Sequence, residues 1–243
     1  MSDIYVIWRD PETTMLEPVA KVYYSQGKYR LAYTEGALNS RFPAFPRMSV
    51  KDKTYSSSDL FPFFKSRIIS ERRPEFSVML SWLDMRQEDY DPLELLSVSG
   101  GSKKTDNFRI IRAPQKTSEN KYRIKFFVSG IAYLDQGSKE RILSLEDKEI
   151  LDYRFEANKN DENAVAILSF GDGMQIGYYP KYLNEDLKKL IDANLLQKRP
   201  EIRVVKVNPE APEQYRLLCE TMCDWPQGFA PFESPKYQSI SKD

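Results

Sequence analysis

Apolar and polar residues alternate in several short stretches of the first half of the chain. Residues 4–8, 19–24 and 29–33 have the composition of strands, and the connection SQGK between the last two contains a glycine suited to a hairpin turn. The proline-rich passage RFPAFPRMSV that follows fits neither a central strand nor the interior of a helix. The pattern predicts a small antiparallel sheet followed by an ordered loop.

Three short helices are predicted between residues 58 and 99. Ser58 or Asp59 can cap a helix through LFPFFKSRII, and Pro74 can occupy the first turn of a helix through EFSVMLSWLDM. Asp91 and a following proline begin a third helix, LELLSV, which a pair of glycines ends. The first half therefore combines a sheet with helices.

The second half is richer in strands, with β-branched and aromatic residues concentrated in separate stretches. The predicted strands cover residues 122–134, 149–157, 164–170, 174–179 and 201–207. A helix is predicted over residues 184–196, because Leu187, Leu190, Ile191 and Leu195 follow helical spacing after a capping Asn184. Gly171 and Gly173 indicate a hairpin.

The polar stretch APQKTSENKYR, residues 113–123, is interpreted as a linker. We therefore expect an α+β protein with a first domain over residues 1–118, a second over 119–232 and a flexible tail over 233–243. The first domain is a small antiparallel sheet with short helices. The second is a β-rich, partly open barrel with one or two helices.

Composition restricts the function. The 243 residues include 36 basic and 36 acidic side chains, so no long-range field draws the protein to a polyanion. No apolar run approaches the roughly 18 residues that a spanning helix needs, and the N-terminus lacks the features of a signal peptide. We expect a soluble, cytoplasmic protein.

The chain contains no histidine, the commonest general base near neutral pH and the commonest transition-metal ligand. Its two cysteines, Cys219 and Cys223, lie in YRLLCETMCDW, where helical spacing would place both on one face. They are interpreted as buried apolar side chains, because two thiols without further ligands do not complete a metal site. We expect no catalysis, no metal and no cofactor.

Three motifs of the second half occur together: VSGIAY at residues 128–133, N-x-x-D-x-N-A at 158–164 and IGYYPKYL at 176–183. In this order they resemble a HIRAN domain, over about residues 121–226. The resemblance implies a small, partly open barrel that binds the end of a single DNA strand. It also implies that the aromatic of the first motif and the aspartate of the second hold the terminal base and sugar.

The resemblance and the flanking charges together define a candidate DNA site. Its members are Tyr133, Arg154, Asn158, Lys159, Asp161, Asn163, Tyr178 and Lys181. Three positions depart from the family pattern, because Ala132, Lys159 and Tyr178 stand where members can carry arginine, proline and histidine. The alternative interpretation is that the Asn and Asp side chains bond only their own loop and that the cations are solvated.

The first half resembles the amino-terminal subdomain of HipA-type kinase toxins, over about residues 3–115, in the order of its hairpin, proline-containing loop, LFPFFKSRIISERRPEF and LELLSVSGGSKKTDNFRI. The resemblance implies docking on a separately encoded kinase lobe, as in a toxin–antitoxin pair. Phe61, Phe64 and Trp82 are candidate contacts for that partner, with packing in the protein core as the alternative. The chain has no glycine-rich phosphate loop, H-R-D or D-F-G motif, which excludes a kinase.

Two functions therefore remain open. The first is a non-catalytic accessory protein that binds single-stranded DNA ends through the HIRAN-like half. The second is a protein-interaction module, or an antitoxin-like partner of a HipA-type kinase core.

Overall fold

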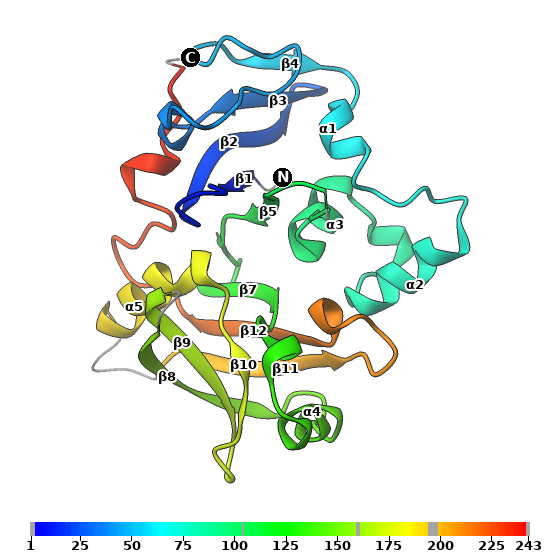
Figure 1. Ribbon diagram of the computed structural model, residues 1–243, viewed down its shortest axis with the longest axis vertical. Helices are drawn as coiled ribbons and strands as arrows, with labels where there is room; N and C mark the ends of the chain where they lie inside the picture. Colours follow the sequence, from blue (N-terminus) through cyan, green and yellow to red (C-terminus); the bar gives the residue numbers. More distant parts are fainter. Residues whose placement is uncertain (1–2, 104, 159–160, 194–198, 242–243) are drawn as a thin grey trace. The chain divides into compact units, whose positions relative to one another are not determined.

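The computed structural model describes residues 3–103, 105–158, 161–193 and 199–241. The chain divides into two compact units, each with its own antiparallel sheet (Figure 1). The first unit comprises Met1–Ser77, Gln87–Ala113 and Ala230–Asp243; the second comprises Val78–Arg86 and Pro114–Phe229. The α+β class predicted from the sequence is confirmed. The sequence did not predict that Val78–Arg86 belongs to the second unit or that Ala230–Asp243 belongs to the first.

The first unit contains a five-stranded sheet in the order β4-β3-β2-β1-β5. Its strands are β1 (Ile4–Arg9), β2 (Leu16–Ser25), β3 (Lys28–Tyr33), β4 (Tyr55–Ser57) and β5 (Phe108–Arg112). The predicted β2–β3 hairpin is confirmed, and its two turn residues, Gln26 and Gly27, have positive φ angles of 52° and 75°. Two left-handed residues match the right-handed twist of the paired strands.

Three helices belong wholly or partly to the first unit: α1 (Pro62–Lys65), α2 (Pro74–Trp82) and α3 (Pro92–Ser99). The predicted start of α3 is confirmed, because the Asp91 carboxylate accepts a 2.8 Å hydrogen bond from the Glu94 amide. Gly100 ends the helix with a φ of 77°, in the left-handed region. Helix α1 is one turn only and begins after Phe61, so neither Ser58 nor Asp59 caps it.

A buried tyrosine organises the core between the sheet and the proline-rich loop. The Tyr33 hydroxyl donates to the Met48 carbonyl oxygen at 2.6 Å and accepts from the Phe45 amide at 2.8 Å. The Tyr33 ring stacks on the Phe45 ring at 5.7 Å between centroids. The loop is therefore ordered, as predicted, because its backbone groups bond to a side chain of the sheet.

The C-terminal segment packs within the first unit, where we expected a flexible tail. The rings of Phe232 and Tyr237 stack at 4.6 Å, and both meet Tyr5 edge-on, at 5.5 and 5.2 Å. The Ile240 amide donates to the Tyr33 carbonyl oxygen at 2.9 Å. Few apolar residues suffice to order this segment, because its aromatic side chains complete a cluster on β1.

Replacing Tyr237 with alanine should lower the free energy of unfolding by about 2 kcal/mol, since the ring loses contacts with two aromatic neighbours. Gln238→Ala is the matched control, because that side chain is exposed and only its backbone is bonded. Chemical denaturation of the two variants checks this. Equal midpoints would indicate that the segment is flexible in solution.

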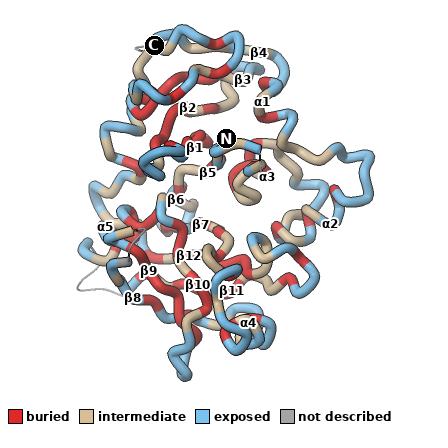
Figure 2. Tube along the Cα trace, viewed as in Figure 1, coloured by how far each residue is buried: buried red, intermediate tan, exposed pale blue. Residues whose placement is uncertain are grey.

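The second unit contains a seven-stranded sheet in the order β10-β9-β8-β11-β12-β7-β6. Its strands are β6 (Gln115–Lys116), β7 (Lys121–Phe127), β8 (Ile150–Asn158), β9 (Asp161–Ser169), β10 (Gln175–Tyr178), β11 (Glu201–Val207) and β12 (Leu217–Asp224). Figure 2 shows long buried stretches along β9 and β12. The sheet is antiparallel and is not a closed barrel.

Two element boundaries in this unit differ from the predicted ones. The stretch predicted as a linker contributes β6 and the start of β7, which pair with each other. The strand predicted over residues 122–134 ends at Phe127, because Gly130 takes a left-handed φ of 81° and the one-turn 3₁₀ helix η3 (Ile131–Tyr133) follows. The Val128 amide still donates to the Leu217 carbonyl oxygen of β12 at 3.0 Å, and the chain turns after this bond.

Helices α4 (Gln136–Leu143) and α5 (Asn184–Ala193) complete the second unit. The amphipathic pattern predicted for α5 is confirmed, with Leu187 and Leu190 fully buried, while Leu195 lies outside the described residues. Helix α4 was not predicted, although Asp135 caps it by accepting from the Ser138 amide at 2.8 Å. No helix in the described part of the chain is long and apolar enough to cross a membrane.

Cys219 and Cys223 lie on β12, so the predicted helix at this position is wrong. Both thiols are nevertheless buried, as expected. Residues four apart also share a face in a strand, and here that face points into the core. Burial raises the pKa of the Cys223 thiol to about 12 and raises the pKa of Cys219 further above its usual value.

The two thiols should therefore react slowly with a disulfide reagent in the native protein. The thiolate is the reacting form, and at pH 8 an exposed thiol with a pKa of about 8.5 is already partly ionised. Thiol titration at pH 8, with and without denaturant, checks this. Fast release of two equivalents from the native protein would contradict the burial of Cys219 and Cys223.

Candidate nucleic-acid interface

Tyr133 presents an open aromatic face at the end of η3. Its side chain is 93% exposed, and its amide donates to the Gly130 carbonyl oxygen at 3.0 Å. Gly130 begins the turn in the left-handed region, which an L side chain adopts only with strain. The main chain of VSGIAY therefore holds this tyrosine outward.

The first and third motifs pack directly on each other. Ser129 and Tyr178 exchange two main-chain hydrogen bonds, each of 2.8 Å. At Gly177, whose φ is 137°, a Cβ atom would lie 2.4 Å from Val128 Cγ1 and 2.7 Å from the Ser129 carbonyl oxygen. Only glycine permits this approach, so the glycines of both motifs have a structural role.

Tyr178 connects this junction to the strand β8. Its hydroxyl donates to Glu156 Oε1 at 2.9 Å, and Arg154 Nε lies 3.3 Å from Glu156 Oε2. Arg154 and Tyr178, both predicted site residues, are thus linked by a carboxylate that the sequence did not single out. The alternation of Arg154 and Glu156 along one strand was the signal for this pair, since residues two apart share a face.

The loop at the start of β9 forms a second cluster. Asp161 Oδ1 accepts from the Asn163 amide at 3.1 Å, and Asp161 Oδ2 accepts from Asn184 Nδ2 at 3.0 Å. The same Asn184 amide nitrogen donates to the Asn163 carbonyl oxygen at 2.8 Å. Lys181 Nζ lies 3.9 Å from Asp161 Oδ1. The loop is thus held by its own backbone and by a side chain of α5.

Asn184 was predicted as the cap of α5, but the structure gives its side chain another partner. It is the first residue of α5, has helical backbone angles and is buried. Its amide bonds the β9 loop, so its contribution is tertiary. Of the other predicted residues, Asn158 ends β8 opposite Asp161, and its side chain is not described. Lys159 lies outside the described residues.

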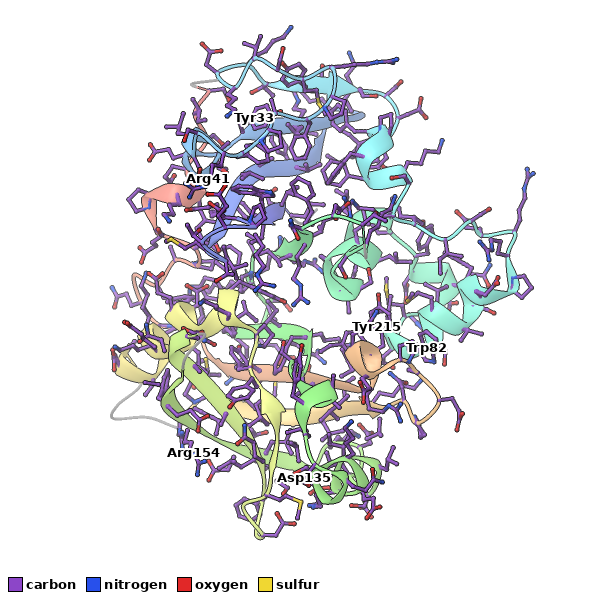
Figure 3. The ribbon with its side chains drawn as sticks, in the orientation of Figure 1. Tyr33, Arg41, Trp82, Asp135, Arg154 and Tyr215 are labelled. Atoms are coloured by element: carbon purple, nitrogen blue, oxygen red, sulfur yellow. The ribbon has the colours of Figure 1, made fainter. Side chains whose placement is uncertain are left out.

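The three residues predicted to contact a partner do not form one surface, because they belong to different units. Phe61 and Phe64 are buried in the core of the first unit, as the alternative interpretation expected, and offer no exposed face to a partner. Trp82 belongs to the second unit, where its ring stacks on Tyr215 (Figure 3). The described residues contain no group of three or more Asp, Glu or Cys side chains placed to hold a metal ion.

Comparison with known families agrees with the three motifs. Residues 121–225 match the HIRAN domain family and include all of VSGIAY, the β9 loop and IGYYPKYL. The chain therefore contains a HIRAN domain in its C-terminal half. The match does not cover residues 1–120, so docking of the first half on a HipA-type kinase lobe stays a prediction.

Two further comparisons add little detail. A search of curated proteins found no match. Among solved structures, the chain is similar to the crystal structure of a protein from Lactobacillus plantarum, with 18% identity and a TM-score of 0.32. The similarity covers 42% of this chain and 97% of that chain.

Asn184→Ala should destabilise the second unit by about 1–3 kcal/mol, because it removes a buried side-chain amide that donates to Asp161 Oδ2 and to the Asn163 carbonyl oxygen. Lys188→Ala, an exposed change on the same helix, should alter stability by less than about 0.5 kcal/mol. Chemical denaturation and amide exchange over residues 161–165 check this. Unchanged exchange in the loop of Asn184→Ala would show that the asparagine does not hold it.

Proposed function

We propose that the second unit binds the end of a single DNA strand, with Tyr133 as the stacking surface for a base. HIRAN domains are known for binding single-stranded DNA ends. The observation that carries the proposal is the exposure of the Tyr133 ring on a turn whose start is held by Gly130 and by the adjacent Ser129–Tyr178 bridge. A preorganised aromatic face of this kind contributes roughly 1–3 kcal/mol per stacked base, whatever the base.

The β9 loop supplies the polar part of the proposed site. Asp161 is oriented by Asn163 and Asn184, and a carboxylate is an acceptor for a sugar hydroxyl. A hydroxyl at the end of a strand would therefore be favoured over a phosphate, which the carboxylate repels. The proposed ligand is a free end of a strand, because a continuing chain would carry a phosphate past Asp161.

The charges around the site favour contact with few phosphates. Arg154 lies beside Glu156 and Lys181 beside Asp161, so each cation already has a carboxylate nearby. Together with the zero net charge of the chain, this pairing supports weak binding of a short end. The absence of histidine and of nucleotide-binding motifs supports a non-catalytic accessory role.

Tyr133→Ala should weaken binding of a short single-stranded oligonucleotide by roughly 1–3 kcal/mol, through loss of the stacking surface. Tyr133→Phe should retain most of the affinity, because it keeps the ring. Lys188→Ala on the exposed side of α5 is the control and should bind as the wild type does. Fluorescence anisotropy at low salt, with the 3′ end free or blocked by phosphate, measures these differences.

The same titration tests end recognition and charge. A free 3′ end should bind more tightly than a blocked one, and the salt dependence should be shallow, at about 0.7 counterions per phosphate contacted. Equal affinity for free and blocked ends would reject recognition of an end. No binding at micromolar protein would leave the HIRAN domain of this chain without the DNA function.

A further inference from the structure

The end of helix α2 is part of the second unit, although it lies about 40 residues before the stretch that matches the HIRAN family. Asp84 follows the helix with a positive φ of 52°. Its amide donates to the Ser81 carbonyl oxygen at 3.2 Å, and the Met85 amide donates to the Leu80 carbonyl oxygen at 3.0 Å. This pair of bonds is the Schellman arrangement, which ends a helix sharply.

Residues of the HIRAN domain complete the cap of this helix. Lys206 Nζ donates to the Ser81 carbonyl oxygen at 2.6 Å, and Asn208 Nδ2 donates to the Trp82 carbonyl oxygen at 3.0 Å. Lys125 Nζ forms a 2.7 Å ion pair with Asp84. The last carbonyls of a helix lack internal donors and carry partial negative charge, so these side chains match the helix end in both hydrogen bonding and charge.

Aromatic side chains extend the same contact. The Trp82 ring stacks on Tyr215 (Figure 3), with 6.0 Å between centroids and 25° between planes. Tyr215 meets Phe127 edge-on, with 5.2 Å between centroids. Asn208 Nδ2 also donates to the Tyr215 carbonyl oxygen at 2.8 Å. The helix end therefore contacts both the ring and, through Asn208, the backbone of Tyr215.

Tyr215 ends the one-turn helix η5 (Glu213–Tyr215), which packs against η3. Lys139 Nζ lies 2.9 Å from Glu213 Oε1 and donates to the Ala132 carbonyl oxygen at 3.4 Å. Ala132 directly precedes Tyr133. A continuous series of contacts therefore runs from Trp82 through η5 to the turn that carries the exposed tyrosine, within the second unit.

We propose that Trp82 is a positioning residue for Tyr133, acting through η5, so that the segment Val78–Arg86 sets the geometry of the DNA-end site. This inference rests on the proposed function where DNA affinity is measured. Amide exchange tests the positioning of Tyr133 without DNA. The positioning of Tyr133 would then depend on a segment that lies outside the stretch matched by the HIRAN family.

The test uses the full chain with Trp82→Ala, Trp82→Phe and Lys206→Met, the last of which removes the side-chain donor to the Ser81 carbonyl oxygen and keeps a side chain of similar length. Amide exchange is measured at Tyr133 and Leu134, whose amides bond within η3, and at β12 as a control for overall stability. Trp82→Ala should speed exchange at η3 by about 2- to 30-fold with little change at β12. Trp82→Phe should restore the wild-type rate, and Lys206→Met should have a smaller effect in the same direction.

DNA affinity provides a double-mutant cycle. Trp82→Ala should weaken end binding by about 2- to 30-fold in the wild-type chain and should have no further effect in the Tyr133→Ala chain. Additive losses would overturn the inference, because Trp82 would then act independently of Tyr133. Equal acceleration of exchange at η3 and β12, in both Trp82→Ala and Lys206→Met, would also overturn it, because the segment would then contribute only to stability.

The two proposals fail in different ways. If the wild-type chain binds no DNA end, the proposed function is rejected. The rate of amide exchange at η3 then still decides whether Trp82 positions Tyr133. If DNA binds but neither exchange nor affinity responds to Trp82→Ala, the positioning role is lost and the proposed function remains.

Discussion

The two main-chain hydrogen bonds between Ser129 and Tyr178 are the constraint on which the second unit depends. They join the segment after β7 to the edge strand β10, although β9, β8, β11 and β12 separate these two strands in the sheet, so the sheet must curve for them to meet. The contact requires a glycine at position 177, because a side chain there would overlap Ser129 and Val128. The turn that exposes Tyr133 begins at Gly130, the residue after Ser129. The contact that joins β10 to this segment therefore also positions the exposed aromatic ring.

Charge pairing limits what this surface can bind. Arg154 and Lys181 are both exposed, yet each lies near a carboxylate, Glu156 and Asp161 respectively. A phosphate must compete with these carboxylates, whereas a base stacked on Tyr133 need not. The proposed DNA-end site would therefore recognise the terminal base and sugar more than the phosphates, in agreement with the zero net charge of the chain.

The compact unit that contains the HIRAN match also includes the segment Val78–Arg86, which lies outside the matched stretch. Leu83 is fully buried, and the end of α2 takes hydrogen bonds from Lys206 and Asn208. Removal of this helix end would delete both hydrogen bonds and the buried Leu83 side chain, which is unfavourable mainly through the lost apolar packing. The first half of the chain therefore contributes directly to the unit that carries the candidate DNA site.

Local sequence determined much of the molecule. The hairpin at Gly27, the cap at Asp91 and the apolar face of α5 follow from side-chain chemistry within a few residues, and the three motifs located Tyr133, Asp161 and Asn163. The contacts of Glu156 with Tyr178 and of Asn184 with the β9 loop were not predicted, because they depend on which strand and helix lie opposite each other. Cys219 and Cys223 show the limit most clearly: a spacing of four residues places side chains on one face of either a helix or a strand. Hydrogen bonds from β12 to β7 and β11 decide between the two, and only the tertiary structure brings those partners together.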